Sequence, residues 1–132
     1  MSDNQFLTEY FKDFMELLKP NNDSIEGLIN VRNLLLEVSN NNKKILIFGN
    51  GGSAAIASHF SVDLTKNAKL RCVNFNEADL ITCFANDYGF DHWSAKAVDF
   101  YGDEGDLLIV ISSSGQSLNM INAVQAARNG NF

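Results

Sequence analysis

The sequence predicts an α/β fold: a Rossmann-like three-layer α/β/α sandwich built on a parallel sheet and preceded by two N-terminal helices. Short, continuously apolar runs such as KILIFG and DLLIVIS suit strands that are covered on both faces. Each run is followed by a stretch with helical spacing, and strands that alternate with helices favour a parallel sheet with right-handed crossovers. The segment 1–40 has helical periodicity only.

Two helices are expected within residues 1–40. Apolar side chains recur at helical spacing in the first of them, at Phe6, Tyr10, Phe14, Leu17 and Leu18. Pro20 breaks this pattern. The second helix is expected to follow Asp23, because Glu26 three residues later resembles a capping box. The polar segment SNNNKK ends it.

Strands and helices alternate over residues 44–132. One or two helices are expected between the second and third strands, and Gly130 is expected at the C′ position of the last helix. Three parallel strands form a thin sheet with an open edge, so the chain is expected to be C-terminally truncated or covered there by a partner. We expect a single domain, 1–132, with helices over 1–40 and the parallel α/β portion over 44–132. The other elements are predicted as strands 44–49, 70–75 and 106–112 and helices 53–66 and 117–130.

Composition restricts the class of protein. The 132 residues are 45% hydrophobic and 20% charged, typical of one globular domain. A net charge of −6 argues against nucleic-acid binding, and no apolar run is long enough to cross a membrane. Cys72 and Cys83 lack CxxC spacing and are expected to be buried, reduced thiols. The protein is therefore expected to be cytoplasmic.

Two loops rich in glycine and serine follow predicted strands: GNGGSA, residues 49–54, and SSSGQS, residues 112–117. Ligands of open α/β sheets bind outside the carboxyl ends of the strands. Each loop leads into a helix N-terminus, where free N–H groups favour an anion, and serine hydroxyls can donate to phosphate oxygens. The sequence therefore predicts a phosphate site, although tight turns and helix caps would also explain these residues.

No nucleotide cofactor is expected. Ala54 stands where the dinucleotide fingerprint GxGxxG requires its third glycine, and a Walker motif is absent from the sequence.

Two further pairs of polar residues are candidates. His59 and Asp63 share a helix face and could bind a metal or transfer a proton, or could form a surface ion pair. Asn86 and Asp87 precede a Tyr-Gly turn and could contact a ligand or end a helix.

The segments GNGGSAAIASHFSVDL, ANDYGFDHW and GDEGDLLIVISSSGQSLNMINAVQAAR resemble the sugar isomerase (SIS) domain family, especially its phosphoheptose isomerase branch. The resemblance extends from the first helix to the last residue. It implies a phosphorylated sugar as substrate and a homo-oligomer, usually a tetramer, with sites at subunit interfaces. By this resemblance the substrate and phosphate contacts are Asn50, Gly51, Ser53, Asn86, Asp87, Ser112, Ser113, Ser114 and Ser117.

The same resemblance implies zinc held by His59 and Asp63, with Asp63 as the catalytic base. Asp63 stands where the family usually has a glutamate and is one methylene shorter. The family's remaining glutamine and histidine come from a C-terminal helix that the sequence does not contain.

Two functions are therefore expected. The first is an aldose–ketose isomerase that converts sedoheptulose 7-phosphate to a heptose 7-phosphate for bacterial surface polysaccharides. The alternative is a non-catalytic SIS-domain protein that binds a phosphosugar and has a regulatory role.

Overall fold

The computed structural model describes residues 2–132. The chain forms two compact units, one ending at Asn33 and the other running from Leu34 to Phe132. The expectation of one domain over 1–132 stays a prediction. Within residues 2–132, no helix is both long and apolar enough to cross a membrane.

The helices α1 (Asp3–Leu17) and α2 (Asn22–Asn40) are the two expected at the N-terminus. Ser2 caps α1 by accepting a hydrogen bond from the Gln5 N–H at 3.3 Å. At the start of α2, Oδ1 of Asn21 accepts from the Ser24 N–H at 2.8 Å. The helix therefore starts at Asn22, before Asp23, and the expected start after Asp23 is wrong. The reason is that Asn21 supplies the cap in place of a capping box.

The three strands are β1 (Ile45–Gly49), β2 (Cys72–Asn74) and β3 (Leu107–Ile111). They form one parallel sheet, as predicted, and the strand order is β2-β1-β3. β2 is shorter than the predicted strand 70–75, because only its central residues pair with β1.

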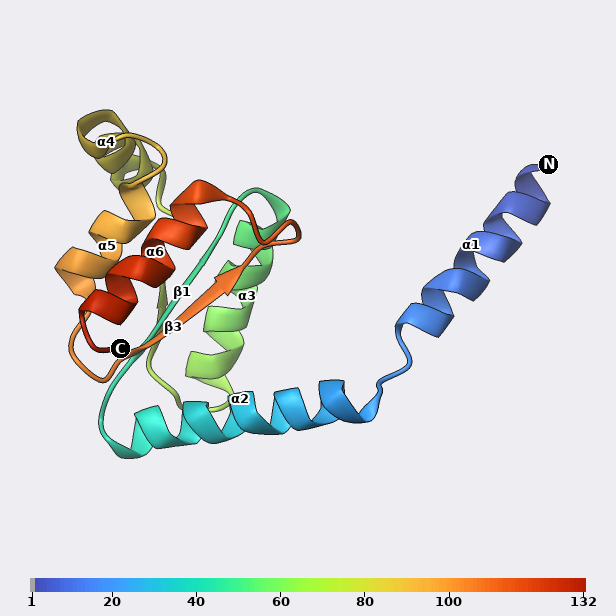
Figure 1. The fold of residues 1–132 in the computed structure, drawn as a ribbon, viewed down its shortest axis with the longest axis horizontal. Helices are drawn as coiled ribbons and strands as arrows, with labels where there is room; N and C mark the ends of the chain where they lie inside the picture. The colour runs from blue at the N-terminus through green and yellow to red at the C-terminus, as the bar shows by residue number, and fades with distance from the viewer. Residues whose placement is uncertain (1) are drawn as a thin grey trace. The chain divides into compact units, whose positions relative to one another are not determined.

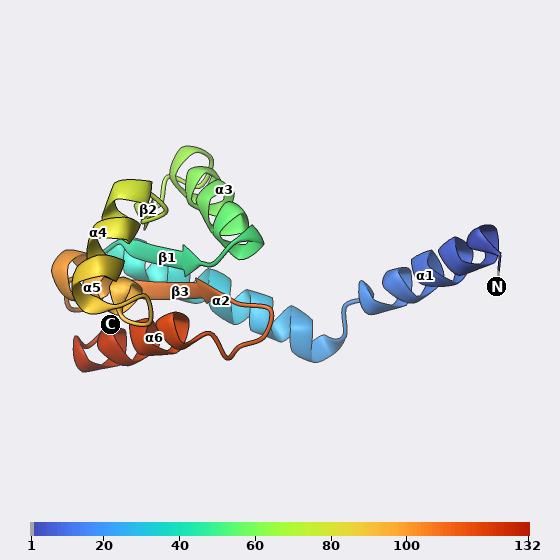
Figure 2. The ribbon, with the colours of Figure 1, turned by 90° about the horizontal axis from the view of Figure 1, so that it is seen from above.

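The sheet lies between two layers of helices, as Figures 1 and 2 show. The C-terminal half of α2 and the helix α3 (Gly52–Lys66) pack on one face, around Ile45. The helices α4 (Ala78–Tyr88), α5 (Trp93–Tyr101) and α6 (Leu118–Asn129) pack on the other, around Phe48 and Trp93. The three-layer α/β/α prediction is confirmed.

The cysteine prediction is partly wrong. Cys72 is half-buried, and burial raises the pKa of its thiol to about 11. Cys83 is exposed, because α4 packs Leu80, Ile81 and Phe84 against the core and leaves Cys83 outside it.

The end of α6 differs from the expectation for Gly130. Gly130 has a φ of −87°, and Asn131 takes the left-handed conformation with a φ of 58°. The Phe132 N–H donates to the Ala127 carbonyl at 3.1 Å, which closes the helix in the manner of a Schellman motif. The glycine is thus the C-cap, and an asparagine supplies the left-handed residue.

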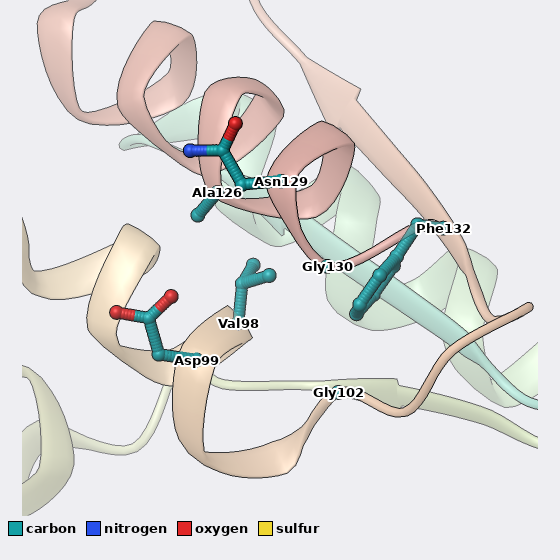
Figure 3. Close-up of a pocket in the computed structure, with 7 residues that line it drawn as sticks. All are labelled: Val98, Asp99, Gly102, Ala126, Asn129, Gly130 and Phe132. Carbon is teal, nitrogen blue, oxygen red and sulfur yellow. The ribbon is translucent and has the colours of Figure 1, made fainter.

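A cavity of about 250 Å³ lies between α5 and α6 at this end of the molecule. Figure 3 shows the residues that line it. The Phe132 ring lies over Gly102, where an added Cβ would come within 1.9 Å of the ring. The cavity lies at the C-terminal end of α6, whereas the glycine- and serine-rich loops both precede helix N-termini. It is therefore separate from the predicted phosphate site.

A charged cluster fixes the beginnings of β1 and β3. The buried Asp106 carboxylate accepts hydrogen bonds from the Lys44 N–H and the Asp103 N–H, each at 2.9 Å. Nζ of Lys44 lies 2.5 Å from Asp106 and 2.6 Å from Asp103. These bonds satisfy the buried carboxylate, which would otherwise destabilise the fold.

The pH dependence of this cluster follows from two shifts. Burial lowers the pKa of Lys44, but its hydrogen bonds and charge interactions with Asp103 and Asp106 outweigh burial and raise it. The hydrogen bond from Lys44, followed by its charge, lowers the pKa of Asp103. The contribution of Asp103 is lost as the pH falls through its folded-state pKa, and that of Lys44 as the pH rises through its own. The cluster is therefore intact across neutral pH.

The first turn of α3 approaches the end of β1 closely. A Cβ added to Gly49 would lie 2.5 Å from the Ser53 carbonyl oxygen and 2.9 Å from the Ala54 nitrogen. Only glycine fits there without a shift of backbone. A Cβ at Gly52 would meet open space.

We expect Asp106→Ala to lower the free energy of unfolding by about 3 kcal/mol, because Lys44 and two backbone N–H groups lose their acceptor. Urea denaturation measures this. The control is Asp99→Ala, which removes an exposed ion pair with Lys96 and should cost less than about 0.5 kcal/mol. Equal losses in the two variants would contradict a structural role for the cluster.

We expect Gly49→Ala to destabilise the fold by about 1–3 kcal/mol through the clash with the first turn of α3. Gly52→Ala is the matched control and should be neutral or stabilising by up to about 1 kcal/mol. Thermal denaturation of both variants makes the comparison. If Gly49→Ala proved as stable as Gly52→Ala, β1 and α3 would not approach as described.

Candidate functional site

Strand register places the two loops at the same edge of the sheet. The last residue of β1, Gly49, pairs with the last residue of β3, Ile111. The segments that follow, 50–52 and 112–117, therefore start at the same level. This confirms the expected meeting of the loops at the carboxyl ends of the strands.

The serine loop, residues 112–117, keeps its hydroxyl donors free. Oγ of Ser112 accepts from the Gly115 N–H and Oγ of Ser114 accepts from the Gln116 N–H, each at 3.1 Å. Ser117 precedes α6 without a side-chain cap bond. Within residues 2–132, none of the hydroxyls of Ser112, Ser113, Ser114 and Ser117 donates a hydrogen bond to a protein group. They can donate to an anion bound at the N-terminus of α6.

The glycine loop, residues 49–54, presents backbone donors instead. Gly51 precedes α3 with a φ of 53° and without a side-chain cap. The Ser53 N–H is already used, since it donates to the Asn50 carbonyl at 2.9 Å. In the described part of the chain, the N–H groups of Gly51 and Gly52 have no protein acceptor. This leaves a second anion-binding helix start at the same edge.

A reciprocal pair of amides joins the two loops. Nδ2 of Asn50 donates to Oδ1 of Asn119 at 2.9 Å, and Nδ2 of Asn119 donates to Oδ1 of Asn50 at 2.8 Å. Sequence reasoning identified Asn50 but missed Asn119. The two are 69 positions apart, and only the fold brings them together.

A cavity of about 220 Å³ opens beside the glycine loop. Nδ2 of Asn76 donates to the Ala54 carbonyl at 2.8 Å and to Oγ of Ser58 at 2.7 Å, which ties this wall to α3. The mixture of amide and aromatic groups suits a small polar ligand. The cavity is lined by Gly49, Asn50, Gly51, Ala54, Asn76, Ile81, Phe90 and Trp93.

Asn86 and Asp87 do not line this cavity. Both are exposed in the last turn of α4, where Nδ2 of Asn86 donates to Oδ1 of Asp87 at 2.9 Å. The helix ends at Gly89. Their predicted ligand contacts stay predictions.

His59 and Asp63 lie on adjacent turns of α3, away from the loop edge. Nε2 of His59 is 3.6 Å from Oδ2 of Asp63, and their side chains are 80% and 49% exposed. Oδ1 of Asp63 also accepts from Nδ2 of Asn67 at 3.1 Å. With Ala55, Ile56 and Phe60 they line a shallow depression of about 450 Å³.

The described residues do not form a complete zinc site. Zinc sites in proteins use at least three protein ligands, whereas His59 and Asp63 provide two. Residues 2–132 contain no group of three or more His, Cys, Asp or Glu side chains placed to hold a metal.

Comparison with known proteins adds independent evidence. The SIS domain family matches residues 9–132. Phosphoheptose isomerase of Fusobacterium nucleatum is 42% identical over 99 residues, which cover 71% of this chain and 51% of that protein. The enzyme of Neisseria gonorrhoeae is 41% identical over 109 residues, covering 78% and 55%.

Solved structures agree with the sequence comparison. The structure of phosphoheptose isomerase from Neisseria gonorrhoeae matches with a TM-score of 0.91 and 34% identity, over 99% of this chain and 72% of that one. The enzyme of Francisella tularensis matches with a TM-score of 0.84 and 28% identity over the same shares. The chain spans about half the length of these first curated relatives. Because the family match covers nearly the whole chain and the fold agrees, the chain belongs to the SIS domain family.

Proposed function

We propose that the protein is a phosphosugar isomerase of the phosphoheptose isomerase type, acting on sedoheptulose 7-phosphate. The observation that carries this proposal is the pairing of a serine loop with free hydroxyl donors and a glycine loop with free N–H donors at one sheet edge. The similarity to phosphoheptose isomerases supports the choice of reaction. A role in the supply of heptose for surface polysaccharides belongs to the same proposal and rests on the resemblance alone. Location in the cytoplasm is proposed from the composition and the cysteine pattern.

In this proposal the phosphate binds to the serine loop. Its oxygens accept from the four serine hydroxyls and from the N-terminal N–H groups of α6. The sugar extends toward Gly51 and Ser53 of the glycine loop. Asn86 and Asp87 are kept as further contacts on the family resemblance alone, since they do not line the cavity beside the glycine loop.

The reaction moves a proton between C1 and C2 through an enediolate, which requires a base. We assign this role to Asp63, the carboxylate next to His59 on α3. Ser53 and Asp63 are ten residues apart on this helix, about 15 Å along its axis. A base must come within about 3 Å of the proton that it removes. The geometry therefore favours a site in which Asp63 of a second protomer approaches the loops.

Zinc enters the proposal only with further ligands. His59 and Asp63 would provide two of them, and the rest would come from a second protomer or from residues outside 2–132. When bound, zinc would polarise the substrate oxygens.

Exposed apolar side chains support self-association. Within α1, Phe6 and Tyr10 stack at 6.3 Å between ring centroids, and Tyr10 and Phe14 at 6.4 Å. The three side chains are 55%, 54% and 47% exposed. An aromatic row of this kind is typical of a helix that packs against a partner, and we propose a homo-oligomer.

A second candidate is a non-catalytic SIS-domain protein that binds phosphosugars and has a regulatory role. The incomplete zinc ligand set and the short side chain of Asp63 favour it. Both candidates share the phosphate site, so they differ only in turnover.

Phosphorus NMR of sedoheptulose 7-phosphate with the protein and zinc tests the function. We expect a new heptose phosphate resonance. Asp63→Asn should abolish it while still broadening the substrate resonance, because the phosphate loop is unchanged. Asp99→Asn on α5 is the control and should turn over normally. If the unaltered protein broadens the substrate resonance without producing a new one, the result would favour the non-catalytic binding protein. If it produces neither broadening nor a new resonance, the proposed phosphosugar site would be excluded.

We expect light scattering to show a species larger than one chain. Replacing Phe6, Tyr10 and Phe14 together with alanine should shift it toward the monomer, because the aromatic row is lost while helix propensity is retained. The control replaces Glu9, Lys12 and Asp13 with alanine on the same helix. Dissociation of both variants alike, or of neither, would exclude the row as an interface.

A further inference from the structure

We propose that Asn119 is a positioning residue that sets the spacing between the glycine loop and the serine loop through its amide pair with Asn50. The inference rests on the proposed function, because it assumes a phosphosugar that contacts both loops at once.

The first step of the argument is how firmly Asn119 is held. Its side chain is buried, with 3% exposed, although it is polar. Its Oδ1 accepts from the Met120 N–H at 3.0 Å as well as from Asn50. Its carbonyl accepts from the hydroxyl of Ser94, a fully buried residue of α5, at 2.6 Å. Contacts from α5 and α6 therefore fix Asn119 before it meets the glycine loop.

The second step is that Asn119 provides the side-chain link between the two loops. Asn50 is only half-buried and follows the last residue of β1. Within residues 2–132, the bonds to Asn119 are the only side-chain hydrogen bonds that join residues 49–54 to residues 112–119. The Asn50 carbonyl is held by the first turn of α3, whereas its side-chain amide is oriented by Asn119. This amide pair therefore sets the distance between the glycine loop and the start of α6.

The pairing leaves capacity for a ligand. A primary amide has two N–H donors and a carbonyl oxygen with two lone pairs, and the reciprocal pair uses one donor and one lone pair of Asn50. Asn50 lines the 220 Å³ cavity, and within residues 2–132 its remaining donor and lone pair have no protein partner. The pair thus orients the side chain for a hydroxyl of the sugar instead of removing it from the site.

This role predicts that ligands of different length respond differently. Inorganic phosphate needs only the serine loop, whereas sedoheptulose 7-phosphate spans both loops. We expect Asn119→Ala to weaken binding of sedoheptulose 7-phosphate about tenfold and to leave the Kd of inorganic phosphate within twofold. Asn50→Ala should weaken it at least as much, since it also removes the amide that faces the cavity, and the double variant should lose no more than Asn50→Ala alone. Titration calorimetry measures each Kd.

Asn122→Ala is the matched control. Asn122 lies on the same helix, and its Nδ2 donates to the Asp91 carbonyl at 2.8 Å and to no residue of either loop. This variant should bind both ligands normally. Thermal denaturation identifies the temperature at which all variants are folded. If Asn119→Ala does not fold, Asn119→Asp carries the test, because it keeps the acceptor for the Met120 and Asn50 N–H groups and loses only the donor to Asn50.

Three outcomes would overturn the proposal: equal weakening of both ligands, unchanged affinity for the sugar phosphate, or additive losses in the double variant. Failure of the proposed function itself looks different. In that case the unaltered protein would not bind sedoheptulose 7-phosphate, whatever residue stands at position 119.

Discussion

Burial of β1 on both faces, with a strand paired along each edge, is the constraint on which the positions of both loops depend. All of its residues from Ile45 to Gly49 are buried, and alternate side chains enter the two separate cores. A slip of one residue would exchange the side chains of the two cores, so the register is strongly specified. That register places the ends of β1 and β3 level. The apolar packing around β1 therefore brings the two candidate anion sites together.

Polar contacts then fix the positions of the segments at the two edges of the sheet more precisely than strand pairing does. At the starting edge, Asp106 holds Lys44 and the chain before β3. At the loop edge, Asn119 holds Asn50. Both side chains are buried, polar and hydrogen-bonded. Each links segments that strand pairing alone does not connect. Apolar burial supplies most of the stability, while these two groups determine local geometry.

Local patterns in the sequence predicted the strands, the helices and both loops, because periodicity and glycine placement are properties of adjacent residues. Contacts between distant residues could not be predicted in this way. The residues next to Asn119 in the sequence form no motif that indicates its role, and its partner Asn50 lies 69 positions away. The helix ends were also predicted incorrectly, because several neighbouring residues are suitable caps. Asn21 caps α2 in place of Asp23, and Asn131 takes the left-handed position expected of Gly130. Cys83 is exposed because of the face that α4 turns inward, which composition does not reveal.

The placement of His59 and Asp63 determines how a complete site must be built. Both are exposed on α3, two to three turns beyond the helix start that forms part of the glycine loop. A rigid helix cannot bend such residues back onto its own N-terminus, so the proposed phosphate site and the proposed base are separated along one axis within a single chain. Exposure and separation together favour chemistry at a boundary with another protomer, where one α3 faces the loop edge of its neighbour. In such an arrangement the spacing of the two loops would have to be fixed before association. The buried amide pair, formed entirely within one chain, would fix that spacing without help from the neighbouring protomer.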